Sequence, residues 1–129
     1  MRNDTADIML MAEFIDGLCE KYQLPMDVGF SLNLALEEAV ANVMKYAYPE
    51  GEVHDIVLSV KLTDNRLMFK LIDTGKPFDP TIVPDADVNL SAEERQIGGL
   101  GIFLVRQIMD SVEYRRIDGK NILTMIKLL

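Results

Sequence analysis

The sequence predicts an α+β fold, a two-layer sandwich in which three helices cover one face of a mostly antiparallel sheet. The first observation is the order of the expected elements: two helices, two strands, a long loop, a third helix and two more strands. The second is that a short polar turn separates the strands of each pair, as in antiparallel hairpins. Helices that are grouped beside hairpins pack on a sheet face, whereas alternating helices and strands would build a parallel sheet.

Two helices are expected before the first strand. Residues 5–22 carry apolar side chains at steps of three and four, which is the spacing of one face of an amphipathic helix. Pro25 ends that pattern, and a second helix is expected from about residue 26 to residue 47, before Pro49. Its apolar face consists of Leu32, Leu36, Val40, Val43 and Ala47.

Four strands are expected as two hairpins. Residues 56–62 and 67–72 each alternate between two sets of side chains around a polar turn, which is typical of antiparallel strands. The later hairpin joins 112–117 to 122–128 through a turn at residues 118–121.

A loop and a third helix lie between the hairpins. The loop, about residues 76–98, contains Pro77, Pro80 and Pro84 and shows no sustained periodicity. A loop of this length inside a compact domain is usually a functional lid or a disordered segment. The third helix is expected to begin at the glycines that follow the loop.

The composition describes one acidic domain over residues 1–129. Its net charge of −8 disfavours a nucleic-acid partner, which would need a basic surface. The single cysteine, Cys19, excludes an intrachain disulfide and suits a reducing compartment. The sequence has neither an apolar run of about 20 residues nor a signal-peptide core, so we expect a cytoplasmic protein without a membrane span.

Glu38 and Asn42 form a polar pair on the second helix. They lie four residues apart, so their side chains stack one helical turn above the other. A carboxylate can act as a general base, and an amide oxygen suits Mg²⁺, which prefers oxygen ligands. A plain solvated helix face would show the same pair.

Asp73 follows Leu67, Phe69 and Leu71 at every second position of the strand. Its carboxylate is therefore expected on the same side of the sheet as these apolar side chains. A buried carboxylate needs a partner, and one at a strand end can accept a hydrogen bond from the amine of adenine. Gly75 would allow the backbone to approach a ligand closely. The alternative is that the strand ends at Ile72 and Asp73 begins a solvated turn.

The segment Gly98-Gly99-Leu100-Gly101 precedes the apolar pattern of the third helix. Glycines there allow backbone N–H groups to approach phosphate oxygens, and a helix N-terminus favours negative charge. The segment is neither a Walker loop nor a dinucleotide fingerprint, and a flexible hinge is the alternative. Together, the three motifs suit the three parts of Mg-ATP.

These motifs extend to longer segments that follow one another in a fixed order. The segments are Leu34–Asn42, Tyr46–Pro49, Asp73–Pro80, Gly98–Arg106 and Val112–Lys127. In this order they resemble the histidine-kinase-type ATPase superfamily, which includes DNA gyrase and the heat-shock-90 chaperones. Within it, the sequence is most similar to the stand-alone anti-sigma-factor serine kinases of bacterial partner-switching systems.

The resemblance implies a role for each motif. Asn42 would coordinate Mg²⁺ between the phosphates of ATP, Glu38 would be the catalytic base, and Asp73 would hold the adenine amino group. The other nucleotide contacts that it implies are Gly75, Gly98, Gly99, Leu100, Gly101 and Thr124. For Thr124 an ordinary β-branched strand residue is the alternative, and Arg95 is either a phosphate contact or a surface charge of the lid.

Two features depart from the family pattern. Tyr46 stands where relatives often carry histidine, and it is given no role. Relatives usually have a strand before the first helix, whereas only about four residues precede it here. The loss of that edge strand would leave the pocket intact and bear on the dimer arrangement and on partner contacts.

The leading functional hypothesis from the resemblance is a serine kinase that transfers the γ-phosphoryl group of ATP to an anti-sigma-factor antagonist. Such a protein also sequesters a sigma factor, and it could form a homodimer. One alternative is a nucleotide-gated binding module without phosphotransfer. Another is a detached histidine-kinase catalytic domain, although the only histidine, His54, is expected to be a solvated turn residue.

Overall fold

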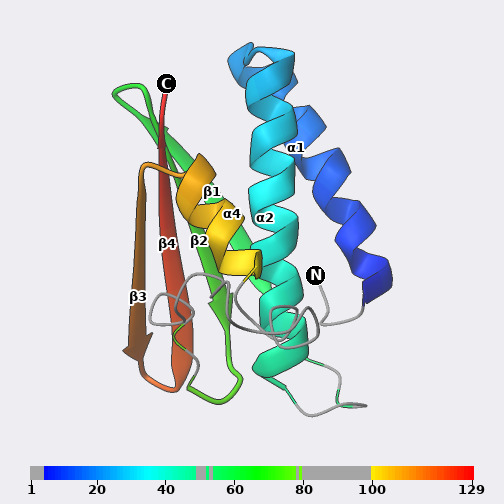
Figure 1. The fold of residues 1–129 in the computed structure, drawn as a ribbon, viewed down its shortest axis with the longest axis vertical. Helices are drawn as coiled ribbons and strands as arrows, with labels where there is room; N and C mark the ends of the chain where they lie inside the picture. Colours follow the sequence, from blue (N-terminus) through cyan, green and yellow to red (C-terminus); the bar gives the residue numbers. More distant parts are fainter. Residues whose placement is uncertain (1–4, 49–51, 53, 78, 80–99) are drawn as a thin grey trace, which may run out of the picture.

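The computed structural model describes residues 5–48, 52, 54–77, 79 and 100–129 (Figure 1). Its elements are η1 (Thr5–Ile8), α1 (Met9–Tyr22), α2 (Met26–Tyr46), β1 (Val57–Thr63), β2 (Arg66–Asp73), α4 (Leu100–Ile108), β3 (Ser111–Ile117) and β4 (Lys120–Leu128). The four strands form one antiparallel sheet in the order β1-β2-β4-β3, and the three helices lie on one side of it. The predicted α+β sandwich is confirmed.

Two tight turns connect the strands of the two hairpins, β1–β2 and β3–β4. Thr63 pairs with Arg66 and Ile117 pairs with Lys120, so each hairpin turns through two residues. In both turns the two central residues have positive φ, at 49° and 61° in the first and 50° and 75° in the second. Turns of this kind match the right-handed twist of the strands. The second turn is shorter than the sequence predicted, and β4 therefore begins at Lys120, two residues early.

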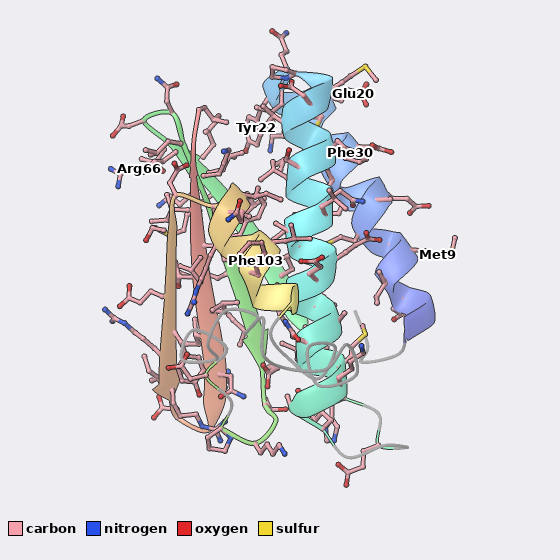
Figure 2. The ribbon with its side chains drawn as sticks, in the orientation of Figure 1. Met9, Glu20, Tyr22, Phe30, Arg66 and Phe103 are labelled. Atoms are coloured by element: carbon pink, nitrogen blue, oxygen red, sulfur yellow. The ribbon has the colours of Figure 1, made fainter. Side chains whose placement is uncertain are left out.

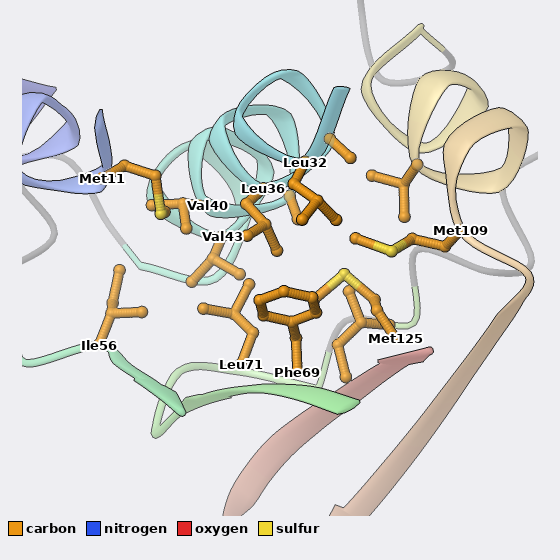
Figure 3. Packing of buried hydrophobic residues seen from close by; sticks show 14 of the residues in the cluster. Met11, Leu32, Leu36, Val40, Val43, Ile56, Phe69, Leu71, Met109 and Met125 are labelled. Atoms are coloured by element: carbon orange, nitrogen blue, oxygen red, sulfur yellow. The ribbon is translucent and has the colours of Figure 1, made fainter. Parts of the chain in front are cut away.

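The core fills the space between the sheet and the helices. Figure 3 shows Phe69 and Leu71 of β2 and Met125 of β4 directed toward α2. The five apolar residues predicted for the inner face of α2 are all buried: Leu32, Leu36, Val40, Val43 and Ala47. This burial, rather than helix propensity, supplies most of the stabilisation of α2.

The helical layer has an inner and an outer part. Helices α2 and α4 pack side by side, and α1 packs against α2. Met9 of α1 and Phe30 of α2 are 77% and 69% exposed, on the side of the layer away from the sheet (Figure 2). Among the described residues none before α1 forms a strand, because residues 5–8 form a 3-10 turn. Within the described part of the chain, no helix has the length and apolar character needed to cross a membrane.

Replacing Phe69 by alanine tests the packing of the core. Phe69 is fully buried at the centre of the sheet, so F69A is expected to lower the free energy of unfolding by about 3–5 kcal/mol. The measurement is urea unfolding followed by circular dichroism. Met68→Ala is the control, since Met68 is a neighbour on the opposite face, only partly buried. An equal loss in the two variants would contradict the described layering.

Candidate functional site

The polar pair of α2 is withdrawn from solvent. Asn42 is 9% exposed and Glu38 is partly buried. The Oε2 atom of Glu38 is buried and has no hydrogen-bond partner among the described residues. Burial, and to a lesser extent the charge of Glu37, raises the pKa of Glu38 to about 7. The burial of Asn42 and of Glu38 Oε2 differs from an ordinary solvated face. A carboxyl group with such a pKa can exchange a proton near neutral pH.

Asp73 is the last residue of β2 and is 3% exposed. Its Oδ1 atom accepts a hydrogen bond from the backbone N–H of Gly75 (2.9 Å) and another from Nδ2 of Asn121 (2.8 Å). These hydrogen bonds offset the cost of burying the polar side chain. The expected inward carboxylate is therefore present, and the alternative of a solvated turn residue is excluded.

Asn121 was not predicted as a site residue, because the sequence placed it in a turn. In the structure it is 4% exposed and lies directly opposite Asp73 in the β2–β4 ladder. Its Oδ1 atom accepts hydrogen bonds from the Tyr114 hydroxyl (2.6 Å) and from Arg116 (3.1 Å). Its Nδ2 atom also donates to the carbonyl of Lys76 (2.8 Å). Asn121 shares the phase of the buried residues of β4, which is the signal that could have revealed it.

The segment after β2 packs against the C-terminal end of α2. The backbone N–H of Lys76 donates to the carbonyl of Ala47 (2.9 Å), and the backbone N–H of Thr74 donates to the hydroxyl of Tyr48 (2.9 Å). A Cβ atom at Gly75 would collide with the Ala47 carbonyl and lie 2.7 Å from the Ala47 Cβ. The sequence predicted that Gly75 would let the backbone approach a ligand. In the structure, its missing side chain lets the backbone pack against the end of α2.

His54 joins the same corner of the molecule. Its ring stacks on Tyr48, with centroids 4.3 Å apart and an interplanar angle of 13°. Its Nε2 atom lies 3.2 Å from Oε2 of Glu52. His54 is thus a packed residue that supports Tyr48, where the sequence predicted a solvated turn residue.

An open groove of about 670 Å³ adjoins this corner. It is lined by Lys45, Ala47, Tyr48, Glu52, His54, Thr74, Gly75 and Lys76. Two lysines therefore flank the backbone that follows Asp73, in a chain whose net charge is −8. Glu52 also lines the groove, and its carboxylate offsets part of this positive charge.

The remaining predicted contacts divide into two groups. Gly98, Gly99 and Arg95 lie outside the described residues, as does most of the expected lid at 76–98. Leu100 and Gly101 form the first residues of α4, as expected for a helix that the glycines open.

Thr124 lies on the other face of the sheet from Asp73. Its partners across the ladders are Lys70 and Glu113, whereas the helix-facing positions of β4 are Asn121, Leu123 and Met125. The structure therefore does not bring Thr124 to the candidate pocket, and the alternative of an ordinary strand residue describes its position. Asn121 is the residue of β4 that contacts Asp73.

Glu38 and Asn42 thus lie one helical turn apart on α2, and Asp73 is buried at the end of β2. The chain belongs to the histidine kinase-like ATPase domain family, whose model matches residues 1–127.

Curated relatives share this domain over most of the chain. The serine/threonine-protein kinase BtrW of Bordetella bronchiseptica is 32% identical over 96 residues, which cover 74% of this chain and 68% of the relative. The serine-protein kinase RsbW of Listeria monocytogenes is 27% identical over 112 residues, covering 84% and 71%. RsbW of Halalkalibacterium halodurans is 29% identical over 119 residues, covering 89% and 72%.

Solved structures show the same fold. The histidine kinase AdeS of Acinetobacter baumannii aligns with a TM-score of 0.51 at 14% identity, over 78% of this chain and 46% of that one. The histidine kinase domain of the blue-light-activated kinase EL346 of Erythrobacter litoralis aligns with a TM-score of 0.55 at 15% identity, over 81% and 46%. The chain spans less than half the length of these two structures, and the likeness concerns the fold alone.

Replacing Gly75 by alanine tests the contact between the Asp73 segment and α2. The added methyl group would collide with the backbone of Ala47, so G75A is expected to cost about 1–3 kcal/mol in the free energy of unfolding. Gly17→Ala is the matched control, because a Cβ there meets nothing within 4 Å and alanine favours the helix. Urea unfolding in which G75A is as stable as the wild type would show that the two segments are not in contact.

Proposed function

We propose that this chain is an ATP-dependent protein serine kinase that transfers the γ-phosphoryl group of ATP to a serine of an anti-sigma-factor antagonist and that also binds a sigma factor. The family and the names of the curated kinases support the reaction class. The observation that carries the proposal is the buried Oε2 atom of Glu38, which has no hydrogen-bond partner among the described residues and lies one helical turn from Asn42. A domain that only bound nucleotide would have no use for this base.

The residues of α2 fit a magnesium ion. Asn42 offers a buried amide oxygen, and the orphaned Oε2 of Glu38 is a second oxygen that lacks a partner among the described residues. Mg²⁺ prefers oxygen ligands and usually binds through few protein groups together with substrate phosphates. Asn42 would hold the ion, which neutralises charge on the phosphates when it is bound.

Glu38 performs the proton transfer in this proposal. With its pKa raised to about 7, Glu38 has both protonation states within reach near neutral pH. The ionised form accepts the proton of the serine hydroxyl as the serine oxygen bonds to the γ-phosphorus. The bond from that phosphorus to the bridging oxygen breaks, and ADP leaves with the electron pair. Asp73 holds the base end of the nucleotide, which orients the phosphates toward Asn42.

Glu38→Gln tests the proposed base. The variant keeps the shape of the side chain but cannot accept the proton, so transfer is expected to fall about 10²–10⁴-fold while ADP binding persists. In the wild type the rate is expected to rise with pH through about 7, because only the ionised carboxylate is active. The measurement is the transfer of label from γ-labelled Mg-ATP to serine on partner proteins captured from the native cell.

Glu37→Gln is the matched control for this experiment. The variant retains the base and removes the neighbouring charge that helps to raise the pKa of Glu38. It is therefore expected to transfer phosphate, with the midpoint of its pH profile displaced to lower pH. Normal transfer by E38Q would refute the assignment of Glu38. Partner binding without label would indicate a gated binding module, and label on a partner histidine would indicate a histidine-kinase domain.

A further inference from the structure

We propose that Asn121 is a positioning residue that fixes the Asp73 carboxylate for recognition of the nucleotide base. The inference deepens the proposed function and depends on Asp73 contacting the adenine amino group. The two hydrogen bonds that described residues donate to the Asp73 side chain both end on Oδ1. The Oδ2 atom therefore remains as the acceptor for a ligand, and a hydrogen-bonded Oδ1 holds it in one orientation.

The orientation of the Asn121 amide is itself fixed. Its Nδ2 atom lies 2.8 Å from Asp73 Oδ1 and 2.8 Å from the Lys76 carbonyl, and both of these oxygens can only accept. Its Oδ1 atom accepts hydrogen bonds from the Tyr114 hydroxyl and from the guanidinium of Arg116, and of these two groups the guanidinium can only donate. If the amide were flipped, its oxygen would face the acceptor oxygens of Asp73 and Lys76, and its NH₂ group would face the donor of Arg116. The side chain thus has all of its hydrogen-bonding capacity committed to one arrangement.

Arg116 joins the β3–β4 hairpin to the segment after Asp73. The same guanidinium nitrogen donates to the carbonyl of Gly75 at 2.7 Å and to Oδ1 of Asn121 at 3.1 Å. The Asp73 carboxylate thus accepts one hydrogen bond from the backbone of Gly75, which follows β2, and one from Asn121 of β4. Loss of Asn121 would leave Gly75 as the remaining described donor to a buried carboxylate.

The test compares two ligands that differ only at the amino group. Isothermal titration calorimetry of the full chain measures the affinity for ADP and for purine riboside 5′-diphosphate, which carries hydrogen in place of the 6-amino group. Asn121→Ala is expected to weaken ADP binding about tenfold or more, because the acceptor of the amino group is no longer oriented. Binding of the analogue, which makes no such contact, is expected to stay within about twofold of the wild type.

Two further variants separate positioning from folding. Tyr114→Phe removes one donor to Asn121 without touching Asp73, so a smaller loss specific to ADP is expected, and this variant decides the matter if N121A fails to fold. Thr124→Ala is the matched control, since Thr124 lies on the same strand and faces away from Asp73. It is expected to bind both ligands as the wild type does.

Each other outcome overturns the inference. Equal loss of ADP and of the analogue in N121A or Y114F would show that Asn121 only supports the fold. Unchanged ADP binding in both variants would show that the orientation of Asp73 does not depend on Asn121. A wild-type chain that fails to bind ADP would refute the proposed function itself, which distinguishes this failure from the other two.

Discussion

The hydrogen bonding of the buried Asp73 carboxylate is the constraint on which the rest of the site depends. Its two donors come from Gly75, two residues on, and from Asn121 on β4. Burial of this carboxylate would be costly without them. The arrangement requires β4 to begin early enough for Asn121 to lie in the ladder, and the two-residue turn at 118–119 achieves this. It also requires Gly75, because only glycine fits against Ala47 at the end of α2.

Two carboxylates in this domain have contrasting environments. Asp73 accepts hydrogen bonds at one oxygen, Oδ1, from Gly75 and from Asn121, which suits a fixed acceptor. Glu38 has a buried oxygen without a partner among the described residues, and its pKa is raised to about 7. Such a contrast separates a binding group from a proton-transfer group. The proposed roles, recognition by Asp73 and base catalysis by Glu38, rest on that difference.

The sequence predicted the order of the helices and strands and the inward position of Asp73, but it did not predict Asn121. The apolar spacing of α2 and the phase of Asp73 were evident because helices and strands repeat with fixed periods. Asn121 was missed because a polar residue beside Asp118-Gly119 is typical of a turn, and its phase with Leu123 becomes informative only once the turn length is known. The contact of Gly75 with Ala47 could not be predicted, since it joins segments distant in the chain.

A crystal structure of the chain with ADP and Mg²⁺ tests the central claim most directly. The account predicts the adenine amino group within hydrogen-bonding distance of Asp73 Oδ2, with Asn121 Nδ2 still on Oδ1 and the phosphates beside Asn42. The same structure is expected to show the metal on the amide oxygen of Asn42. A nucleotide bound with its base away from Asp73, or with phosphates remote from α2, would contradict the account.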